Sequence, residues 1–284
     1  MNVFLTGGTG FIGSHVINTL LGRGHSVLAL KRSSKSYPRV PLLREPNWIV
    51  GSLDQLDSNC LRDIDVLLHL AAHSANYPYD TLENCLKWNL NAPLLLFKAA
   101  YEANVSKYLV AGSCFEYGLA AQNYDFIPAS APLLPVQTYP TSKAAASVSF
   151  IQWAYERKVS MSLLRIFQVY GPGEDPTRLW PTLMRAGENG ADLPMTLGEQ
   201  VRDFIFVQDL ATRLVEEAEQ LYEEEQFIKI ANLGSGQPKT LRSFAQEIWD
   251  TIDSSAQLRF GELSYRPNEI MRYVPDLSPL YLTK

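Results

Sequence analysis

The feature that most constrains the fold is a glycine-rich turn near the start of the chain. Gly7, Gly10 and Gly13 follow a short apolar run, residues 3–5, and open a segment of helical periodicity, residues 11–21. A strand that turns tightly into a helix in this way is typical of the first unit of a parallel α/β sheet. Glycines at this spacing let the backbone approach a pyrophosphate, whose charge the helix N-terminus favours. The sequence therefore predicts a dinucleotide site that includes Gly7, Gly10, Phe11, Ile12 and Gly13.

The rest of the first half repeats this alternation of strand and helix. Short apolar runs are spaced by longer helical patterns as far as residue 166. The pattern predicts an α/β fold with a doubly wound parallel (Rossmann) sheet and a smaller C-terminal substrate lobe. After the first strand, we expect strands at 26–30, 48–50, 66–70, 108–111 and 161–166, and two long helices at 81–103 and 138–157.

The rhythm breaks after Gly171-Pro172-Gly173, where loops become more frequent. We therefore expect a dinucleotide-binding domain over residues 1–166 and a mainly substrate-binding lobe over residues 167–284. This lobe would close over the carboxyl edge of the sheet, where ligands bind in open α/β folds. One strand, near residues 227–232, is expected to return to the main sheet.

Composition excludes several classes of protein. The net charge of −5 gives no footprint for nucleic acid or for an anionic membrane. No apolar run approaches the roughly 20 residues that span a bilayer. Three cysteines without a CxxC pair fit a reducing cytoplasm, and four scattered histidines have no metal-ligand spacing. The expectation is a cytoplasmic protein without a metal site and without nucleic-acid or membrane partners.

Tyr139 and Lys143 indicate the chemistry, because they stand four residues apart in a helical segment. Positions i and i+4 share one helix face, so the phenol and the ammonium can converge on one point. A nearby cation favours phenolate, so Lys143 is expected to lower the pKa of Tyr139 towards physiological pH. A tyrosine near its working pKa donates or accepts a proton at a carbonyl or alcohol carbon. Beside a dinucleotide site, the pair predicts redox chemistry on an oxygen-bearing carbon.

The end of the second strand indicates which dinucleotide binds. An acidic residue there would bond the adenosine ribose and repel a 2′-phosphate. This chain has Lys31, Arg32 and Ser33 instead, and two cations with a hydroxyl suit a phosphate dianion. NADP(H) is therefore favoured over NAD(H), and the alternative is a solvated basic loop.

Other strand ends contribute small and apolar residues near the adenine and ribose. These residues would contact the cofactor, although packing at the sheet edge explains the same composition. His69, which precedes three of them, is expected to be structural. The residues are Leu53, Leu70, Ala71 and Ala72.

Eight stretches of sequence, in the same order along the chain, carry a family resemblance. They are TGGTGFIGS from Thr6, HLAA from His69, GSCFEYG from Gly112, YPTSK from Tyr139, LRIFQVYGPG from Leu164, RDFIFVQDLA from Arg202, NLGSG from Asn232 and YRPNE from Tyr265. Together they resemble an extended short-chain dehydrogenase/reductase of the nucleotide-sugar epimerase/dehydratase group. The resemblance covers essentially the whole chain and implies a nucleotide-sugar substrate.

The resemblance also implies roles for individual residues. Ser113 occupies the active-site Ser/Thr position and would hydrogen-bond the substrate oxygen, with Tyr139 as proton donor or acceptor. Lys143 would bind the nicotinamide ribose, and Asn89 would support the lysine through structure or water.

Four further residues are implied on the substrate side. Arg202 matches the arginine that commonly grips the diphosphate of the sugar nucleotide, a task that suits a forked guanidinium. Arg266 is a candidate for the same diphosphate or for the nucleotide, and either arginine could instead form a surface ion pair. Gln168 stands where many relatives place an asparagine that lines the pocket. His73 would face the substrate, or it would have no role beyond its loop.

A departure from the family pattern bears on the reaction. Dehydratases of this group place an acid and a glutamate directly after the active-site Ser/Thr. Here Cys114 and Phe115 hold those positions, and Glu116 comes one residue late. The pattern therefore disfavours 4,6-dehydration and leaves Cys114 as a candidate substrate contact.

Two enzymatic reactions fit this set of residues. An NADPH-dependent reductase would reduce the C4 ketone of a CDP- or dTDP-linked 4-keto-6-deoxy sugar, whereas a 4-epimerase would oxidise and re-reduce C4 with tightly held NAD⁺. The basic end of the second strand favours the reductase, because an epimerase recycles its NAD. A third hypothesis is a dinucleotide-binding protein without catalysis, but such relatives generally lose the Tyr-x-x-x-Lys pair. The resemblance finally implies a homodimer that forms through the two long helices.

Overall fold

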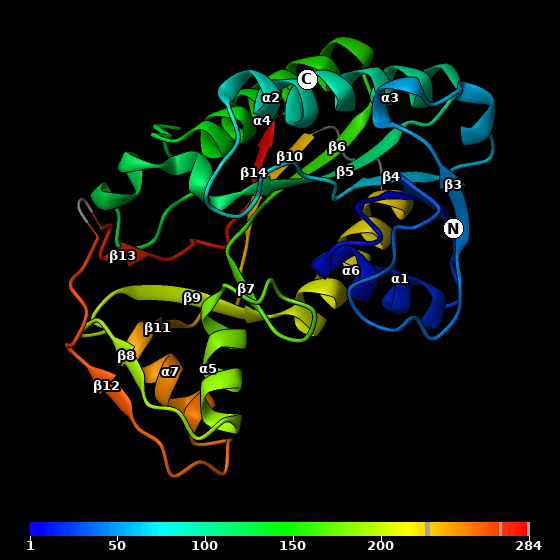
Figure 1. Cartoon of the computed structure of the whole chain (residues 1–284). Helices are drawn as coiled ribbons and strands as arrows, with labels where there is room; N and C mark the ends of the chain where they lie inside the picture. Colours follow the sequence, from blue (N-terminus) through cyan, green and yellow to red (C-terminus); the bar gives the residue numbers. More distant parts are fainter. Residues whose placement is uncertain (225–227, 267–268, 283–284) are drawn as a thin grey trace.

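The computed structural model describes residues 1–224, 228–266 and 269–282, which form two unequal lobes (Figure 1). The strands of the larger lobe are β1 (Asn2–Thr6), β2 (Ser26–Lys31), β3 (Asn47–Val50), β4 (Val66–His69), β5 (Lys107–Ser113), β6 (Ser160–Ile166), β10 (Ile228–Leu233) and β14 (Leu280–Leu282). They form one eight-stranded sheet in the order β14-β10-β6-β5-β4-β1-β2-β3. β14 runs antiparallel to β10, and the other neighbours pair in parallel.

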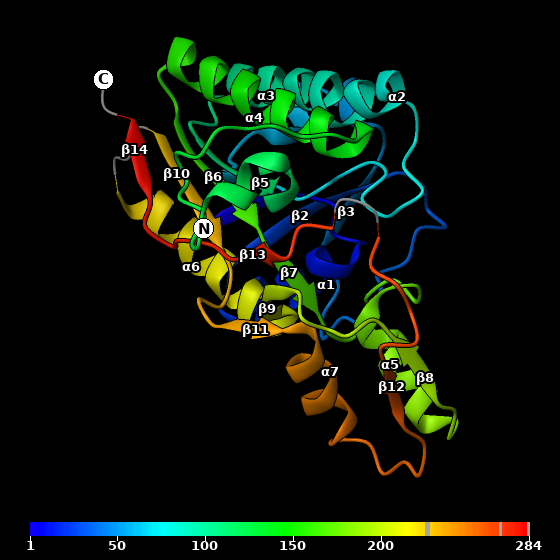
Figure 2. The same ribbon diagram turned by 90° about the vertical axis from the view of Figure 1, so that its left-hand side faces the viewer.

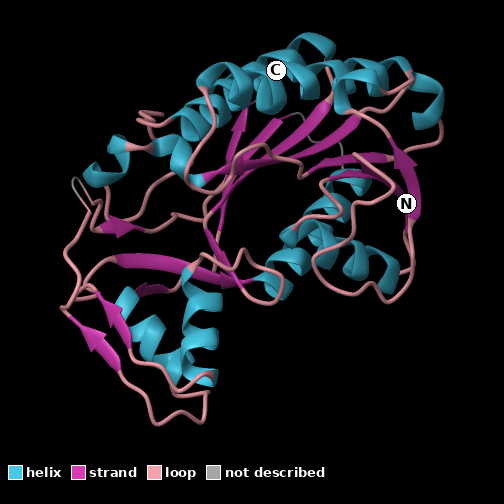
Figure 3. Cartoon of the chain, viewed as in Figure 1, coloured by secondary structure: helices cyan, strands magenta, loops and turns pink. Residues whose placement is uncertain are grey.

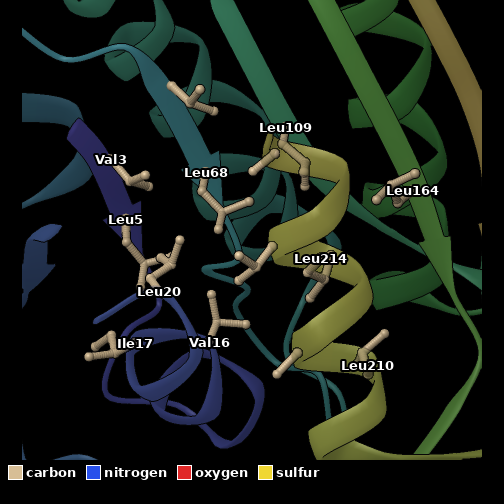
Figure 4. Close-up of a cluster of buried hydrophobic side chains, with 14 of the residues drawn as sticks. Val3, Leu5, Val16, Ile17, Leu20, Leu68, Leu109, Leu164, Leu210 and Leu214 are labelled. Atoms are coloured by element: carbon tan, nitrogen blue, oxygen red, sulfur yellow. The ribbon is translucent and has the colours of Figure 1, made fainter. Parts of the chain in front are cut away.

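Helices cover both faces of this sheet (Figure 3). One face carries α1 (Phe11–Gly22) and α6 (Val207–Glu223), and the other carries α2 (Leu82–Leu86), α3 (Ala92–Glu102) and α4 (Thr138–Arg157). Alternate strand residues fill the two layers: Val3 and Leu5 pack with α1 and α6 (Figure 4), whereas Phe4 packs with α3 and α4. The expected doubly wound parallel sheet is therefore confirmed.

The smaller lobe is built around β9 (Val201–Phe206), which pairs with β7 (Gln168–Tyr170), β11 (Pro238–Thr240) and β13 (Arg272–Tyr273). Its other elements are α5 (Leu179–Glu188), α7 (Leu241–Trp249) and a two-stranded sheet of β8 (Leu193–Met195) and β12 (Leu258–Phe260). The rings of Phe204 and Phe244 stack at 3.8 Å in its core. Figure 2 shows α5, α7, β8 and β12 on the opposite side of the molecule from α3 and α4.

Two details differ from the expectations. The helix expected over 81–103 is interrupted by a π-helical stretch, Lys87–Asn91, between α2 and α3. After residue 166, not only β10 but also α6 and β14 belong to the larger lobe, because α6 carries an apolar face that packs beside α1. The strand expected at 227–232 is β10, and Phe227 lies outside the described residues. Within the described part of the chain, no helix is both long and apolar enough to cross a membrane.

Candidate active site

The glycine-rich turn between β1 and α1 is packed too closely for side chains. Gly7 has a φ of +78°, and a Cβ added there would lie 2.7 Å from the backbone nitrogen of Ala71. A Cβ at Gly13 would lie 2.1 Å from the carbonyl oxygen of Gly7, which also accepts a hydrogen bond from the Gly10 N–H at 2.9 Å. The turn is therefore a bare backbone cradle at the N-terminus of α1. Such a cradle fits a dinucleotide pyrophosphate, because the first N–H groups of a helix have no partner within the helix.

The other residues expected at the cofactor lie around this cradle and along the same sheet edge. Phe11 and Ile12 are the first two residues of α1. Leu70 and Ala71 follow β4 and approach the backbone of Gly7, while Ala72 is exposed. Leu53 follows β3, an edge strand that β1 and β2 separate from β4. It packs against the core beneath α3.

The basic end of β2 lies at the same carboxyl edge, because β2 pairs with β1. Lys31 is the last residue of β2, and its Nζ lies 5.0 Å from the centre of the Trp48 ring. Arg32 and Ser33 follow on the surface, where the Ser33 hydroxyl accepts a hydrogen bond from the Lys35 N–H at 3.2 Å. Arg32 is thus an exposed cation at the position where an acidic residue would select NAD(H).

His69 is a structural residue behind the cradle. Its side chain is buried, with its ring edge-on to those of Phe97 and Phe150, and its Nδ1 lies 2.8 Å from the Thr6 hydroxyl. Burial and, to a smaller extent, the charge of Lys143 lower the pKa of His69 to about 3. The ring is therefore neutral at physiological pH.

The fold brings Ser113, Tyr139 and Lys143 together at the carboxyl edge of the sheet. Ser113 ends β5, and the other two lie one turn apart at the start of α4. All three are buried, with exposed fractions of 7%, 7% and 4%. Tyr139 and Ser113 share a side-chain hydrogen bond, and Lys143 donates from Nζ to the Ala111 carbonyl at 2.7 Å. A hydroxyl, a phenol and an ammonium are thus gathered where a carbonyl oxygen can be held and protonated.

The expected lowering of the Tyr139 pKa is wrong for this structure. Burial raises the pKa of Tyr139, the hydrogen bond with Ser113 lowers it, and the charge of Glu116 raises it. Burial also lowers the pKa of Lys143, while Glu116 raises it. The local spacing of four residues is right, but removal of the phenol from water has the largest effect on its pKa.

Asn89 connects the loop after β4 to α4. It lies in the π-helical stretch and is buried. Its Oδ1 accepts from the His73 N–H at 2.7 Å, and its Nδ2 donates to the His73 carbonyl at 3.1 Å and to the Ser142 hydroxyl at 2.9 Å. Because Ser142 directly precedes Lys143, Asn89 supports the lysine through the backbone of α4. π-Helical turns are frequent at functional sites.

His73 has a partner of its own. Its Nε2 lies 2.7 Å from Oδ2 of Asp80, and the Asp80 carbonyl accepts a hydrogen bond from the Thr138 hydroxyl, also at 2.7 Å. The histidine thus fastens its loop to the first residue of α4.

The residues that follow Ser113 are buried or packed against other side chains. Cys114 is buried, and burial raises the pKa of its thiol to about 12, so it is neutral at physiological pH. The Phe115 ring packs against Tyr273 at 6.3 Å. Glu116 is fully buried and pairs with Arg165 at 2.8 Å.

Gln168 and Arg202 lie in the smaller lobe, and Arg266 lies on the segment that precedes β13. Gln168 begins β7, and its Oε1 lies 3.5 Å from Nη2 of Arg178. Arg202 is in β9 and pairs with Glu269 at 2.7 Å. Arg266 is exposed on the segment that leads to Glu269.

Three residues at this site, Tyr79, Glu174 and Arg178, are not among those expected from the sequence. The Tyr79 ring lies 5.5 Å from the Tyr139 ring at an angle of 31°. Burial raises the pKa of Tyr79, whereas the charges of Arg178 and Arg266 lower it. Arg178 pairs with Glu174 at 3.5 Å, and burial raises the pKa of Glu174 to about 7. The run GEDPTR after Gly171-Pro172 was the available hint for Glu174 and Arg178, whereas Tyr79 lies in a loop without any pattern.

The chain is similar to proteins whose names and bound ligands concern nucleotide sugars. A CDP-abequose synthase of Salmonella muenchen is 22% identical over 95% of this chain and 87% of its own length. A UDP-N-acetylglucosamine 4-epimerase from Methanobrevibacter ruminantium, solved with UDP-N-acetylmuramic acid, is 27% identical with a TM-score of 0.84, over 98% of this chain and 89% of that chain. MoeE5, solved with UDP-glucose and NAD, is 28% identical with a TM-score of 0.79, over 98% and 90% of the two chains.

The family of the chain follows from a match that is much longer than any single motif. Residues 3–233 match the NAD dependent epimerase/dehydratase family, and this range includes the glycine-rich turn, Ser113, Tyr139 and Lys143. The chain therefore belongs to the NAD dependent epimerase/dehydratase family, and it is an enzyme of the nucleotide-sugar type.

Proposed function

We propose that the chain catalyses NADPH-dependent reduction of the C4 ketone of a CDP- or dTDP-linked 4-keto-6-deoxy sugar. The observation that carries this proposal is the combination of a complete Ser113–Tyr139–Lys143 site with a basic, acid-free end of β2. A net reductase draws on the cellular NADPH pool, whereas an epimerase does not consume reductant. The similarity to a CDP-abequose synthase supports a CDP-linked sugar.

Each residue of the site has a chemical task in this reaction. With its pyrophosphate bound in the glycine cradle, NADPH would supply the hydride. The Ser113 hydroxyl would hydrogen-bond the C4 oxygen, and Tyr139 would donate its proton to that oxygen. A raised pKa of Tyr139 suits this direction, because the phenol is then fully protonated before the reaction. Lys143 would hold the nicotinamide ribose with its ammonium, and Arg202 would bind the diphosphate.

The residues beside the catalytic set argue against dehydration. Elimination of water across C5–C6 needs an acid and a base beside C5 and C6. A buried neutral thiol and a phenylalanine stand at the positions that resemble those of the dehydratase acids, and the nearby Glu116 is fully paired. In the reductase reaction, the 4-keto group of the substrate would therefore be formed beforehand by a separate dehydratase.

A 4-epimerase is the second candidate function. It uses the same Ser113, Tyr139 and Lys143, and the similarity to a solved UDP-N-acetylglucosamine 4-epimerase and to MoeE5 with NAD supports it. In that reaction Tyr139 first accepts the alcohol proton and later returns it.

Cofactor binding separates the two candidates. NADPH and NADH are titrated by fluorescence against the purified protein, and any bound nucleotide is released by denaturation and identified. Arg32→Ala should weaken NADPH binding about 10- to 100-fold, since a charge-assisted contact contributes about 1.5–3 kcal/mol. It should leave NADH binding unchanged. Lys35→Ala is the matched control, because it removes an exposed cation from the same loop.

Two outcomes of the cofactor experiment distinguish the reductase from the epimerase. Preference for exchangeable NADPH, followed by NADPH oxidation with a 4-keto-6-deoxy sugar nucleotide, supports the reductase. Stoichiometric, tightly held NAD⁺ with interconversion of C4 epimers and no net oxidation of NADPH would replace it with the epimerase.

We further propose that the protein is a homodimer through α4 and the α2–α3 helices. These helices lie side by side on the outer face of the larger lobe, where Leu95 and Val148 are 50% and 60% exposed. Light scattering after size exclusion measures the mass. Val148→Glu should halve the mass, and a monomeric wild type would contradict the proposal.

A further inference from the structure

We propose that Glu116 is a positioning residue, whose carboxylate locks the Ser113 backbone and the catalytic helix α4 into one arrangement. The inference rests on the proposed function, but only on the Ser113–Tyr139–Lys143 site that the reductase and the epimerase share. Glu116 lies in the 3₁₀ turn Cys114–Tyr117, directly after β5, and its exposed fraction is 0%.

Both carboxylate oxygens of Glu116 are occupied by groups from different elements. Oε1 accepts from the Ser113 N–H at 2.7 Å, at the end of β5. Oε2 accepts from the Ser147 hydroxyl in α4 at 2.7 Å and from Nε of Arg165 in β6 at 2.8 Å. One side chain thus joins the two strands and the helix that surround the reacting position.

The contact with Ser147 is the informative one. Ser147 follows Lys143 by four residues and Tyr139 by eight, so the three side chains share one face of α4. A carboxylate that holds Ser147 therefore fixes the rotation of the face that presents the phenol and the ammonium. Because the same carboxylate holds the Ser113 backbone, it sets the distance between the hydroxyl and the phenol.

The surroundings leave Glu116 no freedom. A Cβ at Gly112 would lie 2.9 Å from Glu116 Oε1, so a glycine is needed beside the carboxylate. Arg165 is held in turn, because its Nη1 donates to the Tyr117 hydroxyl at 3.1 Å and to the Ala129 carbonyl at 2.9 Å. Movement of either partner would leave a buried charge unpaired, which is strongly unfavourable.

The chain offers a control glutamate in a second ion pair, Glu217, whose side chain is 13% exposed. Glu217 accepts from the Ser162 hydroxyl at 2.7 Å and from Nζ of Lys229 at 2.7 Å. This pair has the same chemistry, but it belongs to α6, on the opposite face of the sheet from α4. Glu217→Gln should lower the Tm as Glu116→Gln does and leave turnover within twofold of the wild type.

Four variants test the proposal with the nucleotide sugar that the wild type turns over. Glu116→Gln should lower kcat at least tenfold, with KM and the cofactor Kd within twofold, because the amide nitrogen would face the donors of Ser147 or Arg165. Ser147→Ala should lower kcat severalfold while the ion pair stays intact. The double variant Glu116→Leu with Arg165→Met should recover the Tm, since apolar replacement of a whole buried pair is often neutral, but not kcat.

Recovery of kcat together with the Tm in the double variant would overturn the proposal, because Glu116 would then serve stability alone. A loss of kcat in Glu217→Gln equal to that in Glu116→Gln would overturn it as well. If the wild type turns over no nucleotide sugar, the proposed function fails, and hydrogen exchange of the Ser113 amide decides the positioning role. Fast exchange in Glu116→Gln but not in Glu217→Gln supports the role, and equal protection in both refutes it.

Discussion

His69 should make the protein sensitive to acid. Its side chain is 1% exposed, and its pKa is lowered to about 3 by burial and by the charge of Lys143. In the unfolded chain the same imidazole has its ordinary pKa of 6.5. Between pH 6.5 and 3, His69 therefore binds a proton in the unfolded state but not in the folded state. The stability contributed by neutral His69 is complete above pH 6.5 and is lost as the pH falls towards 3.

The magnitude follows from the two pKa values. Each pH unit below the unfolded pKa removes about 1.4 kcal/mol from the free energy of unfolding. A change from pH 7 to pH 5 should therefore remove about 2 kcal/mol through this residue. Such a loss is a large fraction of the roughly 5–15 kcal/mol that stabilises a typical protein.

Urea unfolding at pH 7 and pH 5 measures this loss in the wild type and in His69→Asn. The asparagine does not titrate, and its amide can still bond the Thr6 hydroxyl that lies 2.8 Å from Nδ1 of His69. The variant will be less stable at pH 7 because its smaller side chain leaves part of the space beside Phe97 and Phe150 unfilled. Its loss between the two pH values should nevertheless be smaller than that of the wild type by about 2 kcal/mol. Equal losses would refute the reasoning.

Four further predictions concern the site. Tyr139→Phe removes the proton donor and keeps the ring, so turnover should fall about 10²- to 10⁴-fold while fluorescence titration gives an unchanged cofactor Kd; weakened cofactor binding would count against the assigned role. Iodoacetamide at pH 8 should label the exposed Cys60 and spare Cys114, whose burial raises the thiol pKa to about 12, and labelling of Cys114 in a peptide map would contradict that burial. Tyr79→Ala should raise KM for the sugar nucleotide about tenfold whereas Tyr79→Phe should not, because the ring that lies 5.5 Å from Tyr139 would pack against the substrate. Equal KM values for Tyr79→Ala and the wild type in steady-state kinetics would show that Tyr79 does not contact the substrate. Arg202→Lys keeps the charge but loses the fork, so KM should rise about tenfold with kcat unchanged, and an unchanged KM would argue against diphosphate binding there.

The sequence predicted the larger lobe well because its signals are local. Apolar strands between helices and a glycine-rich turn are each fixed by neighbouring residues, and the strands lie within two residues of their expected positions. The π-helical stretch Lys87–Asn91 was not predicted, since one extra residue in a turn leaves the apolar periodicity of the flanking helices almost unchanged. The return of α6 to the main sheet depends on which apolar face remains uncovered, and that is decided only in three dimensions.

In the site, too, features that depend on local sequence were predicted, and features that depend on tertiary packing were not. Ser113, Tyr139 and Lys143 come together as expected because the end of β5 and the start of α4 meet at one edge of the sheet. The predicted direction of the Tyr139 pKa shift is wrong, because burial, which depends on segments distant in the sequence, has the largest effect. Tyr79 reaches Tyr139 from an irregular loop, where no periodicity exists to be read.

The ion pair between Arg202 and Glu269 has a consequence for selectivity. The guanidinium already has a carboxylate at 2.7 Å, so any incoming anion must replace that partner before it gains from the arginine. Inorganic phosphate or chloride only exchanges one counter-ion for another, and little free energy is gained. A sugar nucleotide also brings its base and its sugar, whose contacts elsewhere offset the displacement. In the proposed site, the resting pair would therefore act as a threshold that keeps the common anions of the cell out and admits the larger ligand.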